Sequence, residues 1–467
     1  MITRLGQRFS DFFIKVMPSA YVFALGLTLL TGLLALAFTD ASPLDISQGW
    51  YDGFWSLLAF GMQIILIIVT AFSIAQSTPV AKGIDLIGGY IQTPRQVYFW
   101  VVLLGGLLSL ISFGMIVVVA ILARALALRI PGVNYPFLVA CVYFSMNGWV
   151  SGISSSIALL LNTPDNFLIE KGILLETIST GLTLGSHLNL AMVLLFLSLG
   201  PVLFVWLAPQ AQGKEIGDLQ KAQGKKEVPS IKEEARAQRL PYPALSDVLN
   251  NAAWLQCAVG LLGLGFMAHH FWRWGVDLNF NNIIFIFLMT ALLLHKTPLR
   301  FGISMQRATR NISGIVFQFP FYAGIMGIML ATGLGERVGD QLSGLATLQS
   351  FPFFAYVAGG LVNFAIPSAG GEFAVIGPSI LQAVQHLAHA AGASSAETTQ
   401  YMARAAMAIA YGESLSNLLQ PFYLLVVFPI MGLGVRIQAR DVVGYLVIPF
   451  LLLFSLQSLL VVLVPYG

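Results

Sequence analysis

Long apolar runs alternate with short polar segments along almost the whole chain, from Tyr21 to Val464. A bilayer crossing needs about 20 predominantly apolar residues. Runs of this kind begin near Ala20, Phe54, Tyr135, Thr183, Val248, Asn279, Asn311, Thr398 and Val442. The pattern therefore predicts an all-α integral membrane protein with nine crossings.

Two further apolar blocks, 97–128 and 351–387, are too long for one untilted crossing. The first is interrupted at Ser112-Phe113-Gly114 and the second at Pro367-Ser368-Ala369-Gly370-Gly371. Irregular backbone at membrane depth is tolerated only where protein buries it or water lines it. We therefore predict two re-entrant hairpins, each of which enters and leaves the membrane on one side.

The positions of the basic residues agree with this topology. With a cytoplasmic N-terminus, all but four of the 24 Lys and Arg residues lie on the cytoplasmic side, as the positive-inside rule favours. The exceptions are Lys171, Arg273, Arg337 and Arg404. A cleaved signal peptide is the weaker alternative for the first run, because 20–38 is longer than a usual signal-peptide core.

Comparison of the chain with itself at an offset of about 255 residues indicates an internal repeat. Gln63 then aligns with Gln318, and the break at Ser112 aligns with the break at Pro367. The two copies would cross the membrane in opposite directions, which predicts two inverted repeats, each with a re-entrant hairpin and an interrupted transmembrane helix. This construction is typical of secondary transporters, whose substrates bind near the midplane.

We expect a single membrane transport domain over residues 1–467. Its predicted parts are a first repeat (54–207), a cytoplasmic linker (208–247), scaffold helices (248–295) and a second, inverted repeat (311–467). The linker is the one long polar interruption. Its mixture of basic and acidic residues, with few large apolar ones, is typical of a mobile connection.

Composition excludes several functional classes. The chain is 57% hydrophobic and 10% charged, against about 25% charged in soluble domains, so a soluble enzyme is not the default. A net charge of +3 without a long basic face gives no indication of nucleic-acid binding. Cys141 and Cys257 lie in apolar runs, and His386 and His389 lack further ligands nearby, so no metal site is expected.

Four segments at membrane depth combine small, polar and helix-breaking residues: 112–114, 145–156, 363–372 and 412–421. Backbone unwound in such breaks can offer carbonyls to a cation, and amides or hydroxyls to a carboxylate. The candidate substrate-binding residues are Ser112, Gly114, Asn147, Ser154, Ser155, Ser156, Asn363, Ser368, Gly370, Gly371, Gln63 and Gln318. Each has a structural alternative: close packing of helices through the small residues, a structural turn at 367–371, and hydrogen bonds to neighbouring helices from the side chains of Gln63 and Gln318.

Acidic residues distinguish the two repeats. No Asp or Glu occurs from Val97 to Pro164, whereas the matching region of the second repeat contains Glu372 and Glu413. An acid embedded in a membrane is energetically expensive and is a functional candidate by default. We expect Glu413, with Glu372 and Asn417 as further candidates, to couple transport by binding H⁺ or helping to hold Na⁺. The alternative is a structural acid that accepts hydrogen bonds from backbone amides.

Several sequence blocks resemble the AtoE-type short-chain fatty acid transporter family. They are 52–63, 294–298, 318–325 and 408–413, and the resemblance covers nearly the whole chain. It implies an ion-transporter-like fold and a secondary active transporter of acetoacetate, butyrate or similar small monocarboxylates in the bacterial inner membrane. Asn363 and Glu413 match the family pattern, whereas 112–116 and 367–373, at the two hairpin tips, depart from it.

Two other functional classes compete with this prediction. An anion channel would need a continuous pore, and a membrane enzyme would need a nucleophile and a base or a metal cluster, which the hydrophobic segments do not contain. We therefore expect no enzymatic activity and no cofactor apart from Na⁺ or H⁺ as the coupling ion. The expected partners are the monocarboxylate and membrane lipid, without nucleic acid; a homo-oligomer is compatible with the sequence.

Overall fold

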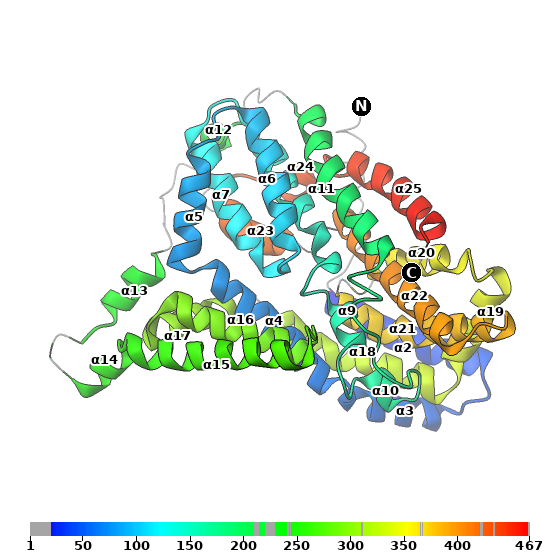
Figure 1. Cartoon of the computed structure of the whole chain (residues 1–467). Helices are drawn as coiled ribbons and strands as arrows, with labels where there is room; N and C mark the ends of the chain where they lie inside the picture. Colours follow the sequence, from blue (N-terminus) through cyan, green and yellow to red (C-terminus); the bar gives the residue numbers. More distant parts are fainter. Residues whose placement is uncertain are drawn as a thin grey trace.

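The computed structural model describes residues 20–209, 214–219, 229–240, 242, 244–309, 312–364, 366, 368–420, 424–432 and 435–465. The regular elements of these residues are helices (Figure 1), which confirms the predicted all-α class. Pro367, at the second predicted break, lies outside the described residues, as does Arg310, one of the basic residues counted on the cytoplasmic side.

The first repeat contains one helical hairpin and one interrupted helix. Its elements are α4 (Leu58–Ala75), α5 (Thr78–Gly88), α6 (Pro94–Ser109), η1 (Phe113–Met115), α7 (Ile116–Arg129), α8 (Tyr135–Ser145), η2 (Met146–Ser151), α9 (Ser156–Leu161), α10 (Phe167–Glu170) and α11 (His187–Leu207). The α6–η1–α7 segment is the hairpin, and α8–η2–α9 is the interrupted helix.

The second repeat has the same order of elements. They are α18 (Ser313–Ala331), α19 (Leu334–Leu345), α20 (Phe351–Asn363), α21 (Ala369–Ala390), α22 (Ser395–Ser416), η3 (Asn417–Leu419), α23 (Leu424–Met431), α24 (Ala439–Val443) and α25 (Val447–Leu463). The predicted hairpins and interrupted helices are confirmed. One boundary was wrong: α22 continues through Gly412 and Glu413, so its break begins at Asn417.

The remaining helices form the scaffold and the linker. The scaffold comprises α2 (Ala20–Phe38), α3 (Pro43–Trp55), α15 (Ala253–Trp274), α16 (Phe280–His295) and α17 (Pro298–Thr309). The described part of the linker contains α12 (Ile216–Leu219), α13 (Ile231–Ala237) and α14 (Leu245–Asn250). In Figure 1, α15 and α16 run side by side, and α16 packs against α4 of the first repeat.

Among the residues that the structure describes, four helical segments are long and apolar enough to cross a membrane. They are Pro43–Ala75, Tyr135–Leu161, His187–Leu207 and Leu245–Trp274. Four more of the predicted crossings correspond to apolar helices of 10–17 residues: Ala24–Phe38, Phe280–His295, Val316–Ala331 and Val447–Leu463. The number of long helices is therefore smaller than the nine crossings predicted from the sequence.

The two ends of the first hairpin lie together. At the end of α7, the Arg129 guanidinium donates to the carbonyls of Gly88 and Ile91, the latter at 2.8 Å. These carbonyls lie between the end of α5 and the start of α6. The chain therefore returns to its starting point after the break at Ser112, as a re-entrant hairpin requires.

The two interrupted helices exchange their second halves. In the first repeat, α9 packs against α21 and α22 of the second repeat. In the second repeat, α23 packs against α7 and α8 of the first, and Figure 1 shows it within that group of helices. Each interrupted helix therefore places the half that follows its break against the hairpin of the other repeat.

Linker helix α13 is attached to scaffold helix α17. Arg307 on α17 forms an ion pair with Glu234 and also donates to the Pro229 carbonyl at 2.8 Å. At the start of α13, the Ser230 backbone amide and hydroxyl donate to the Glu233 carboxylate, and these hydrogen bonds lower the pKa of Glu233. The described part of the linker is therefore a folded segment.

Helices α20 and α22 approach each other through glycines. A Cβ atom on Gly359 would lie 2.5 Å from the Ile409 carbonyl oxygen, and one on Gly412 would overlap the Tyr356 carbonyl oxygen. Such backbone contacts cannot be relieved by a side-chain rotation. The close approach places Asn363, at the end of α20, against the last turn of α22.

We predict that Gly412→Ala destabilises the protein by about 3 kcal/mol, because the added methyl group must separate the two helices. Thermal unfolding of the purified protein in detergent measures this effect. The control is Gly302→Ala on α17, where a Cβ atom meets no atom within 4 Å. Equal melting temperatures of the two variants would show that the α20–α22 contact is less rigid than described.

Candidate functional site

The two helix breaks meet and satisfy each other's backbone carbonyls. The Tyr143 hydroxyl on α8 donates to the carbonyls of Asn417 and Gln420, both at 2.7 Å. In return, the Ser414 hydroxyl on α22 donates to the Asn147 carbonyl at 2.5 Å. An interrupted helix leaves carbonyls without intrahelical partners, and here each repeat supplies the donors that the other lacks.

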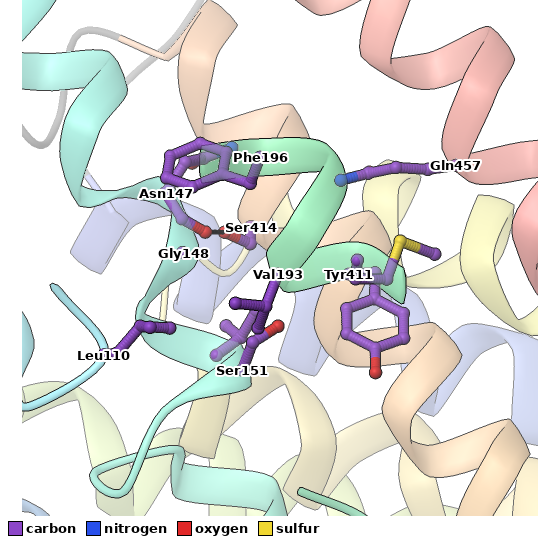
Figure 2. A pocket seen from close by; sticks show the side chains of 11 residues that line it. Leu110, Asn147, Gly148, Ser151, Val193, Phe196, Tyr411, Ser414 and Gln457 are labelled. Atoms are coloured by element: carbon purple, nitrogen blue, oxygen red, sulfur yellow. Dashed lines mark hydrogen bonds between the residues drawn. The ribbon is translucent and has the colours of Figure 1, made fainter. Parts of the chain in front are cut away.

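A cavity lies beside this junction, and its empty space, counted with its open mouth, is about 320 Å³. It is lined by Leu110, Asn147, Gly148, Val150, Ser151, Met192, Val193, Phe196, Tyr411, Ser414 and Gln457, all of them uncharged. Figure 2 shows Gln457 reaching in from α25 with its amide nitrogen foremost. The Gln457 carbonyl oxygen accepts a hydrogen bond from the Tyr356 hydroxyl at 3.1 Å, which leaves the amide nitrogen to face the cavity.

A second cavity, about 250 Å³ when counted with its open mouth, adjoins the first at Asn147. Its lining residues are Phe113, Ile116, Tyr143, Met146, Asn147, Trp149 and Asn417. Phe113, at the tip of the first hairpin, packs edge-on against Trp149 with ring centroids 6.1 Å apart. Both cavities combine apolar side chains with uncharged polar ones, and Asn147 lines each of them.

Asn363 connects the second hairpin to the second break. Its side-chain nitrogen donates to the Glu413 carbonyl at 2.9 Å, Ser416 Oγ at 2.7 Å and Asn417 Oδ1 at 2.6 Å. Its backbone carbonyl accepts from Gln420 Nε2 at 2.5 Å. The structure thus brings the sequence-predicted residues Asn363, Glu413 and Asn417 into one cluster.

Glu372 and Glu413 lie fully buried on neighbouring helices, α21 and α22. Among the described residues, none of their four carboxylate oxygens has a hydrogen-bond partner of normal geometry, although the Asn417 side chain lies close to the Glu413 carboxylate. The two carboxylates are close enough to repel each other when ionised. A structural acid would accept hydrogen bonds from backbone amides. The described contacts include no such bond to either glutamate, so they do not favour this alternative.

The hairpin-tip glycines serve close packing. A Cβ atom on Gly114 would lie 2.9 Å from Ala71 Cβ, and one on Gly371 would lie 2.5 Å from the Tyr322 ring. Gly370 is enclosed by the rings of Phe60 and Phe319. Neither cavity is lined by Gly114, Gly370 or Gly371, so their backbone contacts explain these glycines without a ligand.

The predicted serines fall into three groups. Ser112 Oγ accepts from the Gly114 amide at 3.2 Å and caps η1. Ser154 and Ser155 have buried hydroxyls without partners, and with Ser156 they lead into α9, which packs on α21 and α22. Ser368 is the N-cap residue of α21, but its side chain makes no capping hydrogen bond.

Gln63 and Gln318 lie away from both cavities. The Gln63 side-chain nitrogen donates to Asn281 Oδ1 on α16 at 3.1 Å, and Gln318 Oε1 accepts from the Tyr322 hydroxyl at 3.2 Å. Gln63 therefore bonds across helices, one of the two interpretations left open above, whereas the Gln318 bond lies within α18. Arg404 is also bound within the protein: it is buried and donates to the carbonyls of Val461, Val462 and Val464 at the end of α25.

Sequence reasoning missed several residues of the site, chiefly Tyr143, Tyr411, Gln457 and Asn189. The Tyr411 hydroxyl donates to Asn189 Oδ1 at 3.0 Å, and Gln457 and Tyr411 line the first cavity. Gln457 is a lone amide in an apolar run, the same signal that selected Gln63 and Gln318. The tyrosines gave no comparable signal, because an aromatic residue in an apolar helix is usual in any membrane core.

We predict that Tyr143→Phe lowers stability by about 1 to 3 kcal/mol, since it removes the donor described for the buried Gln420 carbonyl and one of the two donors to the Asn417 carbonyl. Thermal unfolding should show a clear decrease in melting temperature. The matched control is Tyr90→Phe, because the Tyr90 side chain is 81% exposed. An unchanged melting temperature for Tyr143→Phe would contradict the role assigned to these two hydrogen bonds.

Solved transporter structures share this fold. The crystal structure of the YdaH transporter from Alcanivorax borkumensis, described as having an unusual topology, is similar with a TM-score of 0.54 at 14% identity, covering 95% of this chain and 97% of that one. MtrF from Neisseria gonorrhoeae, described in a study of antimetabolite efflux pumps, has a TM-score of 0.51 at 14% identity over 96% of this chain and 94% of its own. At these identities the likeness shows the fold alone.

Sequence relatives identify the family. A protein named as a short-chain fatty acid transporter in Escherichia coli (strain K12) is 36% identical over 97% of this chain and 98% of its own length. A protein of the same name in Haemophilus influenzae is 33% identical over 95% of this chain and 96% of its own length. Residues 1–464 match the family described as short chain fatty acid transporter. The chain is therefore a membrane protein that belongs to the short-chain fatty acid transporter family.

Proposed function

We propose that the chain transports short-chain fatty acids or related small monocarboxylates, such as acetoacetate and butyrate, across the bacterial inner membrane. Transport would proceed by alternating access with H⁺ or Na⁺ as the coupling ion and with the N-terminus in the cytoplasm. The observation that carries the proposal is the pair of adjoining cavities at the junction of the two helix breaks, where Asn147 lines both.

The two cavities suit the two ends of such a substrate. The Gln457 and Asn147 amides and the Ser151 hydroxyl offer neutral donors for a carboxylate in the first cavity. Phe113, Ile116 and Trp149 offer an apolar surface for a short alkyl chain in the second. Because the first cavity is lined by uncharged residues, a cation that enters with the substrate would offset the charge of the carboxylate.

The exchange of α9 and α23 between the repeats supports alternating access. A movement of either hairpin shifts the half-helix of the other repeat that packs on it. In inverted-repeat carriers, one bundle moves against the other around a fixed site. Alternating access without a chemical reaction is also the reason to propose a carrier rather than an enzyme.

Uptake of radiolabelled butyrate into proteoliposomes tests the proposal. We expect saturable uptake that is driven by an inward Na⁺ or H⁺ gradient and accelerated by unlabelled butyrate inside the vesicle. Butyramide, the neutral analogue, should not compete, because it lacks the anion. Flux that does not saturate and shows no such acceleration would instead support a channel, and equal competition by butyramide would remove the argument for an anion site.

We predict that Phe113→Ala widens the second cavity and shifts the preference of the transporter toward fatty acids with a longer alkyl chain. Each methylene in an apolar pocket contributes about 1–3 kcal/mol, so hexanoate should compete for butyrate uptake at least about tenfold better than in the unmodified protein. The control is Phe266→Ala on α15, where the side chain is 59% exposed and distant in sequence from either cavity. Unchanged selectivity in Phe113→Ala would place the alkyl chain elsewhere.

A further inference from the structure

Two buried carboxylates in this chain lack any compensating charge from the protein. Glu372 and Glu413 are each 0% exposed, and among the described residues neither forms an ion pair or a hydrogen bond of normal geometry through its carboxylate. A buried acid is stable only when it is paired, protonated or bound to a metal ion. Each of the two acids must therefore be protonated or bind a cation.

The neighbouring Asn363 amide indicates what kind of ligand this is. Its nitrogen has two hydrogens and lies within hydrogen-bond distance of three oxygens, on Glu413, Ser416 and Asn417, so its donor capacity is fully used. Its carbonyl oxygen, Oδ1, is buried in a residue that is 0% exposed and has no partner. The unsatisfied atoms of this cluster are thus five oxygens that can only accept: Asn363 Oδ1 and the four carboxylate oxygens.

A hard cation satisfies such a set better than a proton does. One proton forms one covalent bond and one hydrogen bond, and it would leave most of these oxygens unpaired. Cations bound by oxygen ligands coordinate several carboxylate and amide oxygens at once. Calcium sites commonly use more than two acids and K⁺ sites use rings of carbonyls, so a set with two acids and one amide favours Na⁺.

We propose that Glu372, Glu413 and Asn363 Oδ1 bind one sodium ion between the second hairpin and helix α22, with one of the two carboxyls protonated so that the charges balance. The proposal rests on the transport function proposed above and identifies its coupling ion. Asn363 also donates to Asn417 Oδ1 at 2.6 Å, and Asn417 lines the second cavity. One hydrogen bond therefore separates the ion site from the substrate cavity, which provides a route for coupling.

Binding of radiolabelled sodium to the purified full-length protein tests the site without transport. We expect saturable binding that excess unlabelled NaCl displaces and that choline chloride and KCl do not. NaCl should also raise the melting temperature relative to choline chloride at the same ionic strength. Glu372→Gln and Glu413→Gln should each lose both effects, whereas Glu176→Gln, which changes an exposed acid outside the cluster, should retain both.

Absence of displaceable sodium binding to the unmodified protein would overturn the proposal, and this measurement does not depend on whether a variant folds. Displacement by CaCl₂ or KCl at lower concentrations than NaCl would also overturn the choice of ion. Binding retained by both Gln variants would place the ion elsewhere. If sodium does not bind but a proton gradient drives butyrate uptake, the sodium site is wrong and the proposed transport function stands. If sodium binds but no carboxylate is taken up, the sodium site stands and the proposed transport function is wrong.

Discussion

The structure depends on satisfying backbone carbonyls where two helices break inside an apolar protein. Water is not available there to accept or donate hydrogen bonds, so each break needs donors from the protein. Tyr143 serves the break after α22, and Ser414 serves the break after α8. Because each repeat completes the other, neither interrupted helix is expected to be stable alone, and the central cavities exist only where the two repeats meet.

This reciprocal arrangement bears on the alternating access proposed above, which needs a site that is both ordered and able to move. The donors are single hydroxyl groups at the ends of helices, and the nearby contacts include small-residue packing surfaces, such as Gly359 and Gly412 between α20 and α22. Such surfaces hold two helices at a fixed distance. In the proposed transport cycle, a hairpin and the half-helix packed on it would therefore shift as a unit.

The breaks could be predicted from the sequence because Ser, Gly, Pro and Asn cluster in otherwise apolar runs, and the hairpins could be predicted from block length and charge. The amphipathic helices α5 and α19 could not, since they are too short and too polar to count as crossings.

For the site, the sequence identified Asn147, Asn363, Glu413 and Asn417. It could not show which polar atoms remain unpaired, because that depends on packing between residues up to about 270 positions apart, as for Tyr143 and Asn417 with a separation of 274.

The two repeats differ in charge, and this difference divides the work of the site between them. The first repeat has no acid from Val97 to Pro164 and contributes Asn147, Ser151 and the apolar tip residue Phe113 to the cavities. The second contributes both buried glutamates. A carboxylate substrate placed against the first repeat would avoid direct contact with the glutamates, and the sodium ion proposed at the second repeat would offset one negative charge there. Inverted repeats of the same shape can thus bind opposite charges side by side, because the fold fixes the position of the breaks and the local sequence decides their charge.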